Sequence, residues 1–78
     1  MGSAKGLGGR LRAARVAAKL TQAEAAKFLG DMRIMTLSAY ENDQSVPRVD
    51  WVEMAAKLYR ADLLWLITGA GEGPAEAA

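Results

Sequence analysis

The sequence predicts an all-α fold, a compact bundle of five short helices in one small domain. Apolar residues recur at three- and four-residue intervals along most of the chain, and a capping residue precedes several of these runs. No segment shows the apolar–polar alternation of a strand. Half of the 78 residues are apolar, and many are alanine, which favours helices that approach one another closely.

The first helix is expected over residues 7–18. Its apolar residues have the spacing of one buried helix face: Leu7, Leu11, Ala14 and Ala18. Arg10 and Arg12 lie off this face, so we expect both side chains in solvent. Gly8 and Gly9 are poor helix formers and should weaken the first turn.

The second helix, residues 22–29, has the clearest boundaries. Thr21 is a favourable N-cap, and Glu24 completes a capping box in which each side chain accepts the other residue's backbone N–H. Gly30 ends the helix because glycine adopts the left-handed conformation of a helix exit without strain. The inner face is predicted to comprise Ala25, Ala26 and Leu29.

The third helix is predicted over about residues 32–41, with Asp31 as its N-cap. Leu37 and Tyr40 are expected to point inward, and the chain turns at residues 42–43. A loop that contains a proline follows and prevents the helix from continuing.

Two further helices complete the bundle. The fourth begins at the N-cap Asp50 and extends to about Tyr59. Its apolar face comprises Trp51, Val52, Met54, Ala55 and Leu58. Asp62 caps a short fifth helix, residues 63–68, that Gly69 closes.

One domain is therefore expected over residues 7–69. Residues 1–6 are predicted to form a flexible N-terminus. Residues 70–78 consist of Gly, Glu, Pro and Ala and lack the apolar content to pack, so we expect a disordered tail.

Composition removes several classes of function. The chain has no cysteine and no histidine, which excludes disulfides, thiolate metal sites and the commonest general base. The glycine-rich segment 69–73 follows a helix and lacks the lysine of a phosphate-binding loop. No apolar run approaches the roughly 20 residues of a membrane span, and no signal peptide is apparent. We expect no enzyme, cofactor, metal, small-molecule substrate or membrane contact.

Charge is unevenly distributed although the net charge is only +1. Residues 1–48 carry eight bases and four acids, a net +4, whereas residues 49–78 carry two bases and five acids, a net −3. A basic half favours contact with a polyanion. Chance segregation of these charges is the alternative explanation.

The order of elements in residues 21–41 is that of a helix-turn-helix, with small residues where the helices touch and a glycine in the turn. Its matching residues are Leu20-Thr21-Gln22, Glu24, Ala26, Leu29-Gly30, Thr36-Leu37-Ser38, Tyr40-Glu41-Asn42, Pro47 and Trp65-Leu66-Ile67-Thr68-Gly69. In these residues the chain resembles the phage-repressor/Cro-like family of lambda-repressor-like helix-turn-helix DNA-binding domains, of the xenobiotic-response-element type.

The resemblance implies roles for individual residues. Arg15 stands where family members pair an arginine with the glutamate at Glu41, which would tie the first helix to the third. Gln22 matches a position that contacts the DNA backbone and sometimes a base, and Asn42 matches a loop position that contacts phosphate. The fourth and fifth helices resemble the elements through which such domains often dimerise.

The sequence departs from the family pattern in three places. One additional residue lies between Gly30 and Thr36, which makes the register of the third helix uncertain. Asp43 and Lys19 each replace a common glycine; aspartate tolerates the left-handed conformation but adds negative charge near phosphate, and lysine costs some strain.

Alignment backward from Tyr40 gives apolar side chains at the base-reading positions: Ile34, Met35 and Ala39. None can form a bidentate hydrogen bond with a base. One possibility is that these residues contact thymine methyl groups, with Arg33, Thr36 and Ser38 supplying polar contacts. The other is that the third helix is rotated so that its apolar residues are buried. We expect burial of at least two of the four residues Met32, Ile34, Met35 and Leu37.

The leading interpretation is a sequence-specific DNA-binding transcriptional regulator, a repressor, that acts as a homodimer. We expect it to be bacterial or phage-encoded, and to be cytoplasmic and associated with the nucleoid. Its candidate DNA contacts are Gln22, Arg33, Ile34, Met35, Thr36, Ser38, Ala39, Asn42, Gln44 and Arg48. The alternative is a protein-interaction module that has kept the fold and lost base recognition.

Overall fold

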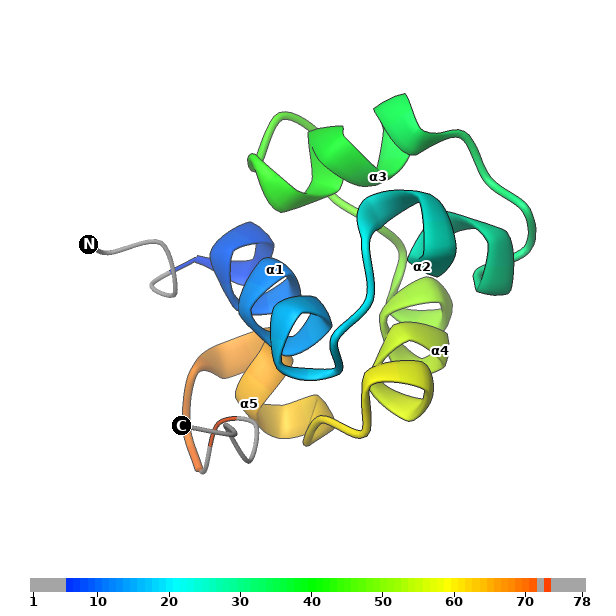
Figure 1. The fold of residues 1–78 in the computed structure, drawn as a ribbon. Helices are drawn as coiled ribbons and strands as arrows, with labels where there is room; N and C mark the ends of the chain where they lie inside the picture. Colours follow the sequence, from blue (N-terminus) through cyan, green and yellow to red (C-terminus); the bar gives the residue numbers. More distant parts are fainter. Residues whose placement is uncertain (1–5, 72, 74–78) are drawn as a thin grey trace.

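The structure, a computed structural model, describes residues 6–71 and 73, and this part of the chain contains five helices and no strand. The helices are α1 (Leu7–Ala17), α2 (Gln22–Phe28), α3 (Ile34–Glu41), α4 (Val49–Tyr59) and α5 (Leu63–Thr68). α1 contacts α3, α4 and α5, whereas α2 packs on α3 and α4 packs on α5 (Figure 1). The all-α class is confirmed. The segments predicted to be a flexible N-terminus and a disordered tail fall largely outside the described residues.

The caps predicted for α2 and α5 are present. The Thr21 hydroxyl accepts a hydrogen bond from the Glu24 backbone N–H at 3.0 Å, and the Glu24 carboxylate accepts one from the Thr21 N–H at 2.9 Å. The Asp62 carboxylate accepts from the Trp65 N–H at 3.1 Å, and Gly69 closes α5 with a φ of 82°. Each cap satisfies N–H groups that a helix start leaves without an intrahelical partner.

The predicted starts of α3 and α4 are wrong by one or two residues. Asp31 is not the cap of α3, because it adopts a left-handed φ of 57° and belongs to the exit turn of α2. The Met32 N–H bonds back to the Ala26 carbonyl at 3.0 Å, so α3 begins only after the N-cap Arg33. α4 likewise begins after Arg48, which places Asp50 inside its first turn, a favourable position for a carboxylate beside the helix dipole.

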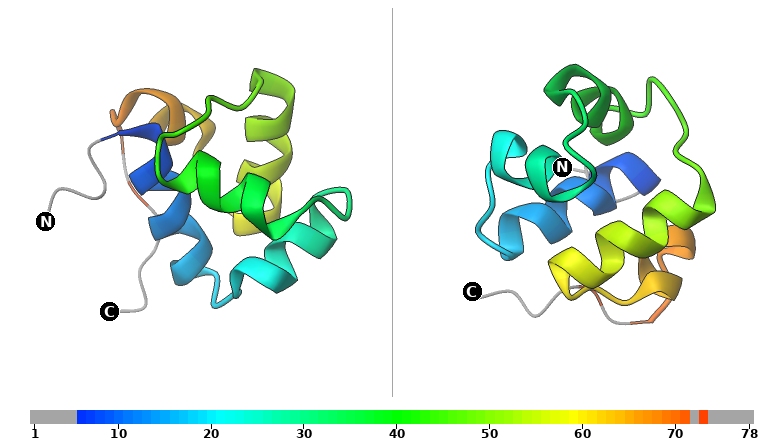
Figure 2. Two further views of the ribbon diagram at one scale, coloured as in Figure 1. Left: turned by 90° about the horizontal axis from the view of Figure 1, so that it is seen from above. Right: turned by 90° about the vertical axis from the view of Figure 1, so that its right-hand side faces the viewer.

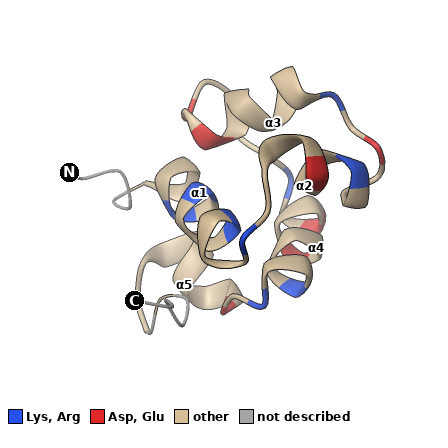
Figure 3. Cartoon of the chain, in the orientation of Figure 1, with Lys and Arg blue, Asp and Glu red and all other residues tan. Residues whose placement is uncertain are grey.

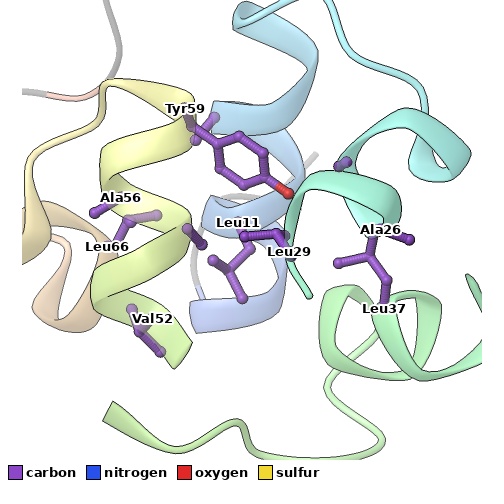
Figure 4. Packing of buried hydrophobic residues seen from close by; sticks show 11 residues of the cluster. Leu11, Ala26, Leu29, Leu37, Val52, Ala56, Tyr59 and Leu66 are labelled. Atoms are coloured by element: carbon purple, nitrogen blue, oxygen red, sulfur yellow. The ribbon is translucent and has the colours of Figure 1, made fainter. Parts of the chain in front are cut away.

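Residues from all five helices, together with Leu29 just after α2, form the core (Figure 4). Its buried members are Leu11, Ala14, Ala25, Ala26, Leu29, Leu37, Val52, Ala55, Ala56, Tyr59 and Leu66. The predicted inner face of α2 is confirmed, but Met54 of α4 is exposed. Tyr40 is half-buried and packs edge-on against Trp51 with ring centroids 4.8 Å apart, which joins α3 to α4.

Arg10 is buried rather than solvated, in contrast to the prediction. Its guanidinium donates to the Leu66 carbonyl at 2.8 Å and to the Ile67 carbonyl at 3.0 Å. These carbonyls lie in α5, where the partial negative charge of the helix end favours a cation. Arg12 is exposed, as predicted.

Gly8 permits a close approach rather than only weakening α1. A Cβ atom at this position would lie 2.5 Å from the Tyr40 carbonyl oxygen and 2.7 Å from that of Glu41. The Gly8 N–H donates to the Asp43 carboxylate at 2.9 Å. This carboxylate follows the end of α3 and caps the start of α1, so it fixes the end of α3 against the start of α1.

No helix in the described ranges is long and apolar enough to cross a membrane.

Candidate nucleic-acid interface

Residues 29–33 connect α2 to α3 and set the register of α3. Gly30 and Asp31 both adopt left-handed conformations, with φ values of 84° and 57°. α3 is helical from Ile34 onward, so the additional residue of this chain lies in the connection and not in the helix. The register counted backward from Tyr40 therefore describes α3.

The outer side of α3 is uncovered by any described helix, as the view from above in Figure 2 shows. Met35 is 80% exposed and Ile34 is 47% exposed. Met32 is half-buried, and only Leu37 is fully buried, so the expectation that two of these four residues are buried is wrong. α3 has only eight residues and presents a single buried apolar side chain to the core.

Two polar side chains at the end of α3 are hydrogen-bonded to one another. The Asn42 side-chain amide donates to the Ser38 carbonyl at 2.8 Å and to the Ser38 hydroxyl at 3.2 Å. Thr36, Ser38 and Ala39 are half-buried, whereas Arg33 and Asn42 are exposed at the two ends of the helix.

Glu41 joins α3 to α1 and to the start of α2. Its carboxylate accepts from Arg15 Nε at 2.7 Å and Nη2 at 3.1 Å, and also from Gln22 Nε2 at 3.1 Å. Arg15 Nη1 donates to the Leu20 carbonyl at 2.8 Å. The side chain of Glu41 is 1% exposed, so this is a buried, bidentate ion pair at the position that the family resemblance implies.

Beside this ion pair lies a polar hollow of about 560 Å³, which we call the α2 hollow. It is lined by Arg12, Arg15, Thr21, Gln22, Glu41 and Asn42. The hollow brings together the N-terminal end of α2, where backbone N–H groups and the helix dipole favour anions, and the end of α3. Gln22 and Asn42 were both candidate backbone contacts, and the structure places them at one hollow.

A family model for the helix-turn-helix domain matches residues 6–64, about three quarters of the chain. The chain belongs to this family. The family is of the Cro/lambda-repressor-like type, which confirms the resemblance and implies DNA binding. No curated protein and no solved structure matches the chain.

Sequence reasoning missed Arg12 of this helix-turn-helix domain as a candidate contact. Its exposed guanidinium lines the α2 hollow with Gln22 and Asn42. The spacing of Arg12 and Arg15, three residues apart on one helix, places them one turn apart and was the available signal. One arginine of this pair supports the fold, and the other is free to contact a ligand.

The basic surface of the helix-turn-helix domain is smaller than the sequence count implies. Arg10 and Arg15 are buried, which leaves five exposed bases between residues 6 and 48: Arg12, Lys19, Lys27, Arg33 and Arg48. α3 itself carries no Lys or Arg (Figure 3). Arg48 is exposed and lies 3.7 Å from Asp50, a surface separation at which an ion pair contributes little.

The two residues that replace family glycines have different consequences. Lys19 adopts a φ of 64° and is exposed, so it keeps the strained conformation predicted for it. Asp43 adopts a φ of 58°, but one carboxylate oxygen accepts the Gly8 N–H. Its negative charge is therefore directed toward the start of α1, where it is stabilising.

Tyr59 is buried in the core, close enough to Arg15 and Glu41 for both charges to act on its hydroxyl. Burial raises the pKa of its hydroxyl; the negative charge of Glu41 adds to this effect, and the positive charge of Arg15 opposes it. None of the described residues forms a hydrogen bond with the hydroxyl. Within the described ranges there is also no group of three or more acidic side chains that could hold a metal ion.

Proposed function

We propose that this helix-turn-helix domain is a sequence-specific transcriptional regulator, a repressor, that binds double-stranded DNA as a homodimer with α3 in the major groove. The observation that carries the proposal is the uncovered outer side of α3 beside the α2 hollow. In a helix-turn-helix, the second helix enters the groove while the first crosses the backbone. A bacterial or phage-encoded regulator of this kind acts in the cytoplasm, in association with the nucleoid.

The backbone contacts surround α3. Arg12, Gln22 and Asn42 line the α2 hollow, where a phosphate would meet both a cation and the positive end of α2. The Gln22 amide already donates to Glu41, so its second N–H is the one available to phosphate. Arg33 at the start of α3 supplies a cation at the opposite end.

Gln44 and Arg48 extend this surface into the loop that follows α3, where both side chains are exposed. The Gln44 backbone N–H bonds to the Ala39 carbonyl at 2.9 Å, which fixes the loop against the helix. We assign these two residues to contacts with the phosphate backbone on the far side of the groove.

A homodimer follows from the size of the domain. One helix-turn-helix contacts only a single half-site, and two linked copies gain both contact area and effective concentration. Leu64 and Ile67 of α5 are 56% and 42% exposed, which leaves apolar side chains on this helix for a second copy. The half-sites would then lie one helical turn of DNA, about 34–36 Å, apart.

A salt titration of binding to a duplex selected from a random pool tests the proposal. Arg33→Ala should reduce the slope of log K against log salt by about 0.9, the value for one phosphate contact. Arg60→Ala is the matched control, because Arg60 is an exposed arginine at the end of α4, away from α3. If wild type and Arg33→Ala give the same slope of log K against log salt, the result would count against α3 in the groove.

The exposed apolar side chains favour one alternative, a protein-interaction module. Phe28 at the end of α2 is 63% exposed, in addition to Ile34 and Met35. Exposed apolar groups often mark partner surfaces. If a protein partner perturbs these three residues and DNA does not, the regulator proposal is wrong.

A further inference from the structure

We infer that α3 recognises the C5-methyl groups of pyrimidines in the major groove, and that thymine is the base this domain selects. This inference rests on the proposed function and names the feature of DNA that the same site contacts. It assigns Met35 and Ile34 as specificity-determining residues.

The exposed side chains in the first half of α3 are apolar. Residues at the N-terminal end of the recognition helix are those that reach base edges. Here these positions hold Met35 and Ile34, the two most exposed apolar side chains of the helix. Neither side chain can donate a hydrogen bond to a base, and the Met35 sulfur is only a weak acceptor.

The polar side chains of α3 are poorly placed to recognise bases in place of Met35 and Ile34. Base-specific bidentate contacts require a side chain such as Arg, Lys, Asn or Gln. Asn42 is the single residue of these types between residues 34 and 42, and its amide nitrogen is bonded to Ser38. Bidentate hydrogen bonds with a base can therefore come only from Arg33, which precedes α3, and Thr36 and Ser38 can offer only single hydrogen bonds.

Arginines lie near both ends of α3, which argues for DNA as the occupant of its exposed side. Arg33 immediately precedes α3. Arg12 lines the α2 hollow with Asn42, and Arg48 lines a second hollow with Tyr40, so both border the second half of α3. A helix with exposed apolar side chains and with cations near both of its ends fits a groove in which a base methyl group lies between two rows of phosphates.

The methyl group at C5 is the apolar group that a base presents in the major groove. Thymine carries it, and uracil and unmodified cytosine lack it. Burying a methyl group of this size against an apolar side chain should change affinity about fourfold, and two methyl groups in one half-site about 15-fold. Selection should therefore enrich thymine at the positions facing the first half of α3.

The test compares thymine with uracil. Duplexes are selected from a random pool with the intact chain, and the enriched sequence is then prepared with uracil in place of each thymine in turn. We expect about a fourfold loss of affinity at each contacted position and none in flanking sequence. Equal affinity for thymine and uracil at every position would overturn the inference while leaving DNA binding intact.

Two variants separate a side-chain contact from an effect of uracil on DNA shape. Met35→Ala and Ile34→Ala should abolish the thymine–uracil difference at the position each contacts. Val16→Ala is the control, because Val16 is an exposed apolar residue on α1 that lines neither of the two hollows beside α3. If the difference persists in all three variants, α3 does not contact the methyl group. If no duplex is enriched at all, the proposed function and this inference fail together.

Discussion

Replacement of Arg15 by alanine should destabilise the domain without removing a DNA contact. The change deletes both donors to Glu41 from α1 and the bond to the Leu20 carbonyl. It leaves a carboxylate whose side chain is 1% exposed, with the Gln22 amide as its remaining side-chain donor among the described residues.

The expected loss is large relative to the stability of a domain of this size. Removing one partner of a buried ion pair typically costs about 3–5 kcal/mol, because the other charge is left without compensation. A chain of 78 residues has a free energy of unfolding of roughly 4–12 kcal/mol, so this loss is about a quarter of the total or more. An exposed ion pair would contribute only about 0.2–1 kcal/mol.

Urea unfolding measures the loss, and two variants test its cause. Glu41→Gln added to Arg15→Ala removes the stranded charge and should recover part of the stability, which a double-mutant cycle quantifies. Arg12→Ala, one turn away on α1, should leave stability nearly unchanged but reduce the salt slope of DNA binding by about 0.9. If Arg15→Ala costs less than about 1 kcal/mol and reduces the salt slope instead, Arg15 contacts phosphate and this reasoning is wrong.

Three further substitutions test individual features of the fold. Gly8→Ala should lower the melting temperature, because a Cβ atom 2.5 Å from the Tyr40 carbonyl oxygen would force α1 away from α3. The expected loss of stability is about 1–3 kcal/mol. An unchanged melting temperature would contradict the close approach of the two helices. Arg60→Gly should stabilise the domain by roughly 0.5–1 kcal/mol in thermal unfolding, because Arg60 adopts a φ of 56°, whereas Arg60→Ala should not; equal effects would attribute the gain to charge. Tyr59→Phe should lessen alkaline destabilisation. The folded-state pKa of Tyr59 is raised, so its contribution is complete below the unfolded value of 10.0 and is lost as the pH rises further, by about 1.4 kcal/mol per unit. Parallel stability curves for Tyr59→Phe and wild type between pH 9 and 11 would refute this assignment.

Features set by neighbouring residues were predictable from the sequence. The Thr21–Glu24 capping box and the Asp62 cap depend on bonds that span three residues, so local sequence specifies them. Gly69 closes α5 for the same reason. These local features were sufficient to predict the order of helices and the all-α fold.

Most features that depend on distant partners were not predictable from the sequence pattern; the Arg15–Glu41 pair was expected only because the family resemblance implied it. Arg10 was expected in solvent because its partners, the Leu66 and Ile67 carbonyls, lie at the opposite end of the chain. The bond between Gly8 and Asp43 spans 35 residues and converts an apparent weakness of α1 into a contact.

The face of α3 could not be assigned from the sequence because a short apolar helix is usually buried. The pattern around Met35 fits either burial or exposure, and the register depended on how the connection accommodated an additional residue. The left-handed pair Gly30 and Asp31 accommodates it before the helix begins. The candidate contacts at the two ends of α3 were therefore easier to locate than those along it.

An NMR titration of amide resonances with the selected duplex tests most directly whether α3 enters the groove. The account predicts shifts at Gln22, Arg33, Met35 and Asn42 that reverse on addition of salt, and unchanged resonances at the buried Leu66. Shifts confined to α4 and α5, or none at any ratio of duplex to protein, would contradict it.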